Sequence, residues 1–115
     1  MSPDEVLTAL TEKVIRLTRE CVGEWPHFFA FDVPETNHEA RLSVSRERRF
    51  RREDNWRLSV GVKENGSSRL HSHFLCHGEG QAGKDQILAY LERPEFHEEF
   101  ISSVRELSRH VDQDD

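Results

Sequence analysis

Apolar residues recur at helical spacing close to the N-terminus. They fall three or four positions apart from Leu7 to Cys21, as expected when one face of an α-helix is buried. Ser2 and Pro3 precede this stripe and match the N-cap and the first position of a helix. The pattern therefore predicts one helix that begins at Pro3 and ends near Gly23.

A second helical region is predicted towards the C-terminus. Residues 84–92 form a short amphipathic segment, and Pro94 interrupts it because proline cannot continue a helix. A longer apolar stripe then begins at Phe96 and continues to Val111. We expect a single domain that spans residues 1–111, followed by a frayed acidic tail at residues 112–115.

Between these helices the pattern changes to that of β-strands. Strands are predicted at residues 27–33, 40–50, 55–63 and about 70–77, and Asn65-Gly66 after the third is a strong hairpin signal. Apolar and polar residues alternate in the second and third strands, which is typical of an antiparallel sheet with one buried face. The predicted fold is a two-layer α+β domain in the order α-β-β-β-β-α-α, with the helices packed on one sheet face.

The same alternation predicts which side chains point away from the helices. Ser72, Phe74 and Cys76 would face the core, so no aromatic residue is expected on the exposed face. The residues predicted to be exposed are Arg41, Ser43, Ser45, Glu47 and Arg49 on the second strand, Arg57, Ser59, Gly61 and Lys63 on the third, and His71, His73, Leu75 and His77 on the fourth.

Residues 71–85, HSHFLCHGEGQAGKD, contain a possible phosphate-binding pattern. Their glycines and the lysine after them fit both the dinucleotide fingerprint and most of a Walker A loop. However, no second parallel strand follows, and Asp85 stands where a Walker loop needs Ser or Thr. The stretch is therefore interpreted as a turn between a strand and a helix.

His71 and His73 raise the alternative of a metal site. Two histidines that are two positions apart on a strand point the same way and can share a zinc ion. A third ligand is missing, because the neighbouring exposed positions carry residues such as Arg57 and Lys63. We expect no cofactor, and a histidine-based metal-binding protein stays a minor alternative.

No catalytic constellation is recognised either. Cys76 and His77 are adjacent on a strand and so point to opposite faces, which rules out a Cys-His dyad. No serine lies in a nucleophile-elbow pattern, and paired carboxylates such as Glu98-Glu99 fall on predicted helix surfaces. The protein is therefore predicted not to be an enzyme.

Charge is distributed unevenly along the chain. The net charge is −6, yet residues 41–77 are basic while the segments on either side are acidic. The sheet and the helices are therefore expected to differ in sign. Acidic residues near the start, and no apolar run of roughly 20 residues, predict a cytoplasmic protein without a membrane segment.

These observations predict a small acidic protein-binding domain. The preferred hypothesis is a bacterial immunity or antidote-type inhibitor, monomeric or homodimeric, that neutralises a toxin or enzyme by capturing a basic active site. A nucleic-acid-binding or adaptor/chaperone protein that uses a basic sheet face is the alternative, supported by the arginine-rich residues 46–52. The candidate partner-binding residues are Arg41, Arg49, Arg57, Lys63, His71, His73, Glu95, Glu98 and Glu99.

Overall fold

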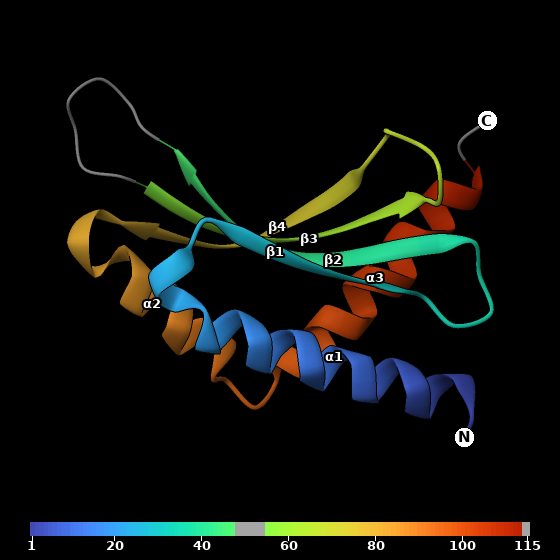
Figure 1. Cartoon of the computed structure of the whole chain (residues 1–115). Coiled ribbons are helices and arrows are strands. Elements are labelled where there is room, and N and C mark those ends of the chain that lie inside the picture. Colours follow the sequence, from blue (N-terminus) through green and yellow to red (C-terminus); the bar gives the residue numbers. More distant parts are fainter. Residues whose placement is uncertain (48–54, 114–115) are drawn as a thin grey trace.

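The computed structural model describes residues 1–47 and 55–113 and contains the predicted sequence of elements (Figure 1). Helix α1 (Pro3–Glu20) is followed by a short 3-10 turn, η1 (Val22–Glu24). The strands are β1 (His27–Asp32), β2 (His38–Glu47), β3 (Asn55–Glu64) and β4 (His71–Glu79). A second 3-10 turn, η2 (Gly80–Ala82), leads into α2 (Gly83–Leu91) and α3 (Phe96–Gln113).

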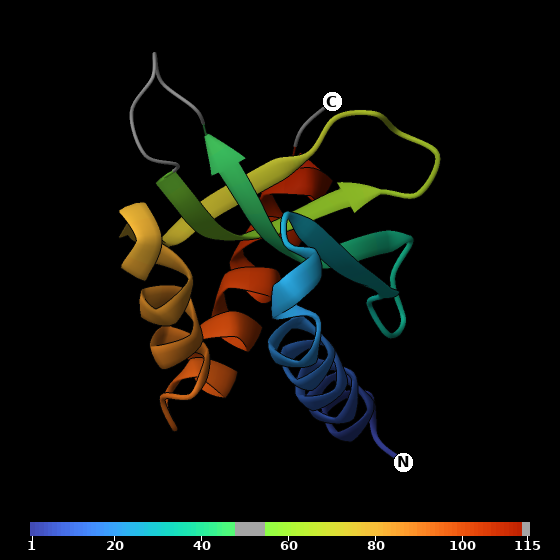
Figure 2. The same ribbon diagram turned by 60° about the vertical axis from the view of Figure 1, so that its left-hand side comes forward.

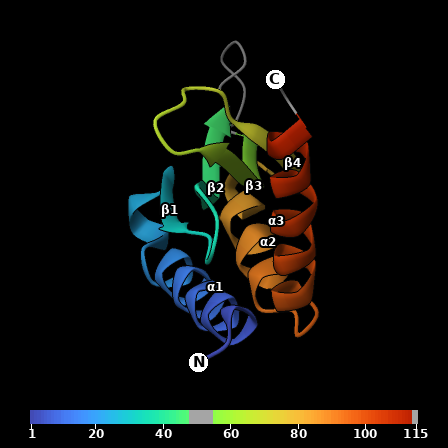
Figure 3. The same cartoon turned by 90° about the vertical axis from the view of Figure 1, so that its right-hand side faces the viewer.

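The four strands form one antiparallel sheet in the order β1-β2-β3-β4. Helices α1, α2 and α3 lie on the same side of this sheet, and none of the described helices covers the opposite side (Figures 1 and 2). Figure 3 shows the same two layers from the end of the molecule. The predicted two-layer α+β fold is confirmed.

The start of α1 follows the predicted capping pattern. The Ser2 hydroxyl accepts a hydrogen bond from the Glu5 backbone N–H at 3.2 Å, and Pro3 occupies the first turn. The helix ends at Glu20, before Gly23, because the chain turns there into η1. The buried face of α1 includes Leu7, Val14 and Ile15, which belong to the predicted apolar stripe.

The core lies between the sheet and the helices. β2 and β3 contribute fully buried aliphatic residues, and α3 contributes Phe96 and Phe100, both 0% exposed. The Phe100 ring lies 6.2 Å from the Phe31 ring of β1, so α3 reaches across to the edge of the sheet. Burial of large aromatic rings is a major source of stability in a domain of this size.

The last turn of α3 is attached to β2. Asp112 Oδ1 lies 2.9 Å from His38 Nε2, and His38 is only 4% exposed. The helix therefore continues to Gln113, two residues past the boundary expected at residue 111.

In the first half of β4, the side chains do not lie on the faces of the sheet that the sequence alternation predicted. His71 pairs with Val62 and His73 with Val60, and both valines are 0% exposed on the helix side of the sheet. Directly paired residues in an antiparallel sheet point to the same face. The prediction that His71 and His73 lie on the exposed face is therefore wrong.

A β-bulge explains this change of face. Ser59 pairs with Phe74 and Leu58 with Cys76, so Leu75 is an extra residue without a pairing partner on β3. The bulge reverses the alternation, and Phe74 points outwards while Cys76 and Leu75 pack against the core. The prediction that Phe74 faces the core is wrong, and so is the exposed position predicted for Leu75.

Candidate interaction surface

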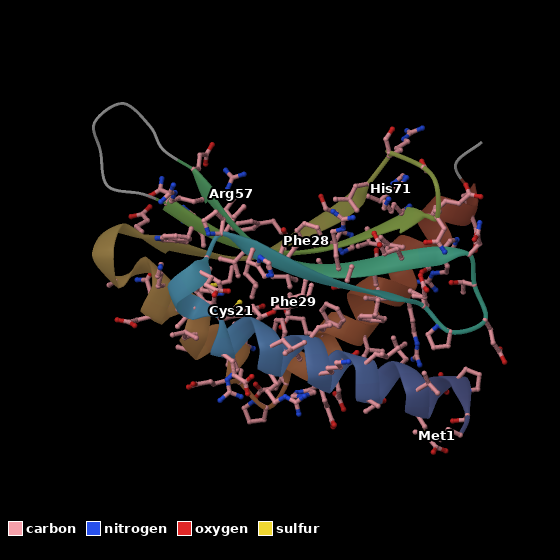
Figure 4. The ribbon with its side chains drawn as sticks, viewed as in Figure 1. Met1, Cys21, Phe28, Phe29, Arg57 and His71 are labelled. Atoms are coloured by element: carbon pink, nitrogen blue, oxygen red, sulfur yellow. The ribbon has the colours of Figure 1, made fainter. Side chains whose placement is uncertain are left out.

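The side of the sheet without helices is called the outer face below. Figure 4 labels Phe28 and Arg57 on this side, whereas Phe29 points towards the helices. The strand register assigns to the outer face Phe28, Ala30 and Asp32 of β1, Glu39, Arg41, Ser43, Ser45 and Glu47 of β2, Asn55, Arg57, Ser59, Gly61 and Lys63 of β3, and Ser72, Phe74, His77 and Glu79 of β4.

Two exposed phenylalanines lie on opposite edges of the outer face. Phe28 on β1 is 49% exposed and Phe74 on β4 is 59% exposed. The register places Ser43 and Ser59 between them in one row across the sheet. Three inter-strand spacings separate the two edges, about 14 Å. The row therefore consists of two small polar side chains with an aromatic ring at each end. The sequence predicted no aromatic residue on this face.

Each exposed ring has an arginine beside it. The Arg41 guanidinium lies 4.5 Å from the centre of the Phe28 ring, and the Arg57 guanidinium lies 5.9 Å from that of Phe74. A guanidinium over an aromatic face gains electrostatic attraction and limits the motion of both side chains. The two ends of the row are therefore partly ordered before any partner binds.

The cations of the outer face are paired with acids on the same face. Arg41 lies 2.7 Å and Lys63 lies 3.9 Å from the Glu39 carboxylate. The Arg57 guanidinium lies 3.0 Å from Glu47. Although Arg41, Arg57 and Lys63 occupy the predicted face, their charges are compensated there. The described part of the outer face is therefore not a basic surface.

Leu70 extends the apolar part of this surface. It is 42% exposed, and a Cβ added to Gly61 would meet its side chain at 2.9 Å. Leu70 therefore packs over Gly61, in the space that a Cβ at this position would share. Gly61 pairs with Ser72, so the leucine lies close to the edge strand that carries Phe74.

The acidic residues that were predicted to bind a partner lie in the helical layer. Glu95 precedes α3, and Glu98 and Glu99 lie in its first turn. Figure 2 shows this helix on the side of the sheet opposite the outer face. Glu99 accepts a hydrogen bond from Tyr90 and lies 3.9 Å from Arg93, which also lies 3.6 Å from Glu95. The structure thus separates these acids from Arg41, Arg57 and Lys63. Arg49 lies outside the described residues.

No candidate metal centre is found among the described residues, in which no cluster of three or more His, Cys, Asp or Glu side chains could hold an ion. Burial raises the pKa of the Cys76 thiol above its ordinary value, and it does the same for Cys21. A raised pKa keeps a cysteine in its less reactive thiol form. Each thiol therefore ionises less readily than that of an ordinary cysteine.

The glycine-rich stretch serves packing between β4 and α2. A Cβ on Gly78 would overlap the Gly83 carbonyl, and one on Gly83 would lie 2.7 Å from Trp56 Cδ1. The Lys84 ammonium donates a hydrogen bond to the Val22 carbonyl at 3.2 Å and lies 4.9 Å from the Trp56 ring. The lysine that a Walker A loop would direct at a phosphate is therefore engaged within the fold.

Sequence reasoning identified the outer face on β2 and β3 but missed its aromatic residues on the edge strands. The sequence does not predict which side of the sheet Phe28 lies on, because apolar and polar residues do not alternate clearly in the segment HFFAFDV. Phe74 was placed on the wrong face, because a bulge leaves no clear mark in the sequence.

None of the described helices is both long and apolar enough to cross a membrane. No family model, curated protein or solved structure matches this chain.

Proposed function

We propose that this protein is a non-catalytic domain that binds a protein partner through the outer face of its sheet. The observation that carries the proposal is the exposed pair Phe28 and Phe74, held on opposite edges of a rigid sheet. Aromatic residues and arginine are enriched in protein interfaces relative to the rest of the protein surface. The serines between them let a partner approach the backbone closely.

The charge pattern favours a protein over a nucleic acid as the partner. Arg41, Arg57 and Lys63 already have carboxylate partners on the outer face. A polyanion would have to displace those carboxylates or bind close to them, which weakens its attraction. A protein can instead join these ion pairs at the rim while its apolar groups cover the two rings.

We propose further that the partner is a toxin or enzyme that this chain neutralises. Support comes from the small size, the net charge of −6 and the lack of a recognised catalytic constellation. Under this proposal the outer face supplies the contact area. The acidic residues at the start of α3 would lie outside that contact.

The test begins with affinity capture and identification of the partner, followed by measurement of its dissociation constant. We expect F28S and F74S each to weaken binding by at least tenfold, because each removes an aromatic anchor worth more than about 1.4 kcal/mol. The matched control is E98Q on α3, which should change the dissociation constant by less than about threefold. Unchanged affinity in both phenylalanine variants, or a larger loss in E98Q, would refute the proposed surface.

Single-stranded nucleic acid is the second candidate, since exposed rings on a sheet can stack on bases. Fluorescence anisotropy with a short labelled single-stranded RNA distinguishes the two. Binding that weakens steeply with salt and is lost in F28S and F74S would favour the nucleic acid. Binding that is absent at physiological salt would favour the protein partner.

A further inference from the structure

We propose that a cavity in the helical layer binds a small apolar molecule with a single carboxylate. The cavity has a volume of about 320 Å³ and lies where the start of α1, the β1–β2 connection and the second half of α3 meet. This volume falls at the small end of the range for ligand sites. The cavity is on the opposite side of the sheet from the outer face, so this inference does not depend on the proposed function.

The walls of the cavity are largely apolar. Leu7 of α1, Val33 and Pro34 after β1, and Val104 of α3 line it. Val104 is 0% exposed and Leu7 is 5% exposed, so these side chains form a floor that belongs to the core. Such walls favour an alkyl or aryl group over a wholly polar ligand, because that group leaves water on binding.

One polar group in the lining has no partner within the described residues. Ser108 Oγ on α3 is buried and makes no hydrogen bond there. A buried hydroxyl without a partner costs free energy, and a ligand oxygen that accepts its proton would remove that cost. Rotation of the Ser108 side chain towards the cavity would let its hydroxyl donate to a ligand head group.

Two guanidinium groups set the charge of that head group. Arg105 and Arg109 line the cavity, and Arg105 Nη2 lies 2.8 Å from Asp4 Oδ1. An arginine has five N–H donors, so Arg105 keeps some of them after it binds Asp4. Two cations near one carboxylate can accommodate one further negative charge, whereas the Asp4 carboxylate would repel a dianion. A monocarboxylate fits this balance better than a phosphate does.

The experiment titrates octanoate into the full chain, with 1-octanol as the uncharged control, by calorimetry and by amide chemical shifts. We expect octanoate to bind at least tenfold more tightly than 1-octanol, with shifts at Leu7, Val33 and Val104. Both R109Q and S108A should weaken octanoate binding by about tenfold, because each removes a hydrogen bond to the carboxylate. D4N should strengthen it, because the competing carboxylate is removed.

The matched control is R16Q, which removes an exposed arginine of α1 that does not line the cavity. Unfolding curves of every variant exclude loss of structure as the cause of a change in affinity. Equal affinity for octanoate and 1-octanol would overturn the proposal. So would the absence of octanoate binding, shifts confined to other parts of the chain, or an R109Q variant that binds like R16Q.

Discussion

At the scale of single residues, the Tyr90 hydroxyl joins α2 to α3. It donates a hydrogen bond to the Glu99 carboxylate, and the Arg93 guanidinium lies 4.6 Å from the centre of its ring. Burial, together with the hydrogen bond and negative charge of Glu99, raises the pKa of Tyr90 to about 12, although Arg93 opposes the shift. The neutral phenol is therefore the form that the folded protein favours.

Tyr90 can be titrated directly, because it is the only tyrosine in the chain. We expect phenolate absorbance of the folded protein to have its midpoint at about 12, against 10.0 for an ordinary tyrosine. Between these values the folded state holds more protons than the unfolded state. The contribution of this pKa shift to the free energy of unfolding is therefore fully present below pH 10 and is lost as the pH rises to about 12. E99Q should lower the midpoint, and Y90F should lessen the alkaline loss of stability. A midpoint near 10 in the folded protein would contradict this account.

At the scale of elements, the junction between β4 and α2 depends on close contact between two glycines. Gly78 has no space for a Cβ because the Gly83 carbonyl lies against it, and Gly83 in turn lies against Trp56. The spacing of these glycines matches that of a phosphate-binding loop. In this fold, however, the close packing of β4, α2 and Trp56 explains why glycines occupy these positions. The junction fixes the position of α2 under the edge of the sheet.

The packing role predicts a difference between glycines. G78A should lower the free energy of unfolding by about 1–3 kcal/mol, because the added methyl group forces the backbone of β4 and α2 apart. G23A is the control, since a Cβ there would meet nothing within 4 Å. It should change stability by less than about 0.5 kcal/mol. Urea unfolding measures both variants, and an equal effect of the two would argue against the packing role.

At the scale of the whole molecule, the residues that stabilise the fold and those proposed to bind a partner lie on opposite faces of the sheet. Phe100 is 0% exposed and connects α3 to Phe31 of β1 and Phe96 of its own helix. Phe28 comes from the same strand as Phe31 but projects from the opposite face and is 49% exposed. One face of β1 therefore belongs to the core and the other is available to a partner.

This separation predicts opposite outcomes for two phenylalanine truncations. F100A should lower the free energy of unfolding by about 3–5 kcal/mol, because it leaves a cavity between the layers. F28A should cost less than about 1 kcal/mol, because its ring is half exposed and gains mainly from the contact with Arg41. Denaturant unfolding compares the two, and a similar cost for both would show that the outer face is structural.

The order and type of the elements could be predicted from the sequence because each depends on local spacing. The stripe from Leu7 to Cys21 and the one that begins at Phe96 repeat at helical intervals, and the alternation in β2 and β3 repeats every second residue. These periods are properties of the backbone geometry. The outer positions of Arg41 and Arg57 followed correctly from them.

The candidate surface was only partly predictable because its composition depends on how strands pair. Leu75 forms a bulge only against Leu58 and Ser59 of β3, and that bulge turns Phe74 outwards and His71 inwards. The compensation of Arg57 by Glu47 also requires two strands in register.

By itself, the sequence determined that the chain forms one helix, four antiparallel strands and two further helices, because hydrophobic period is a local property. Only the tertiary structure decided which residues occupy the outer face and whether their charges are compensated. Both depend on contacts between segments far apart in the chain, such as Arg41 with Phe28. The face that the sequence predicted to be basic and without aromatics is, in its described part, charge-compensated and has an exposed phenylalanine at each edge.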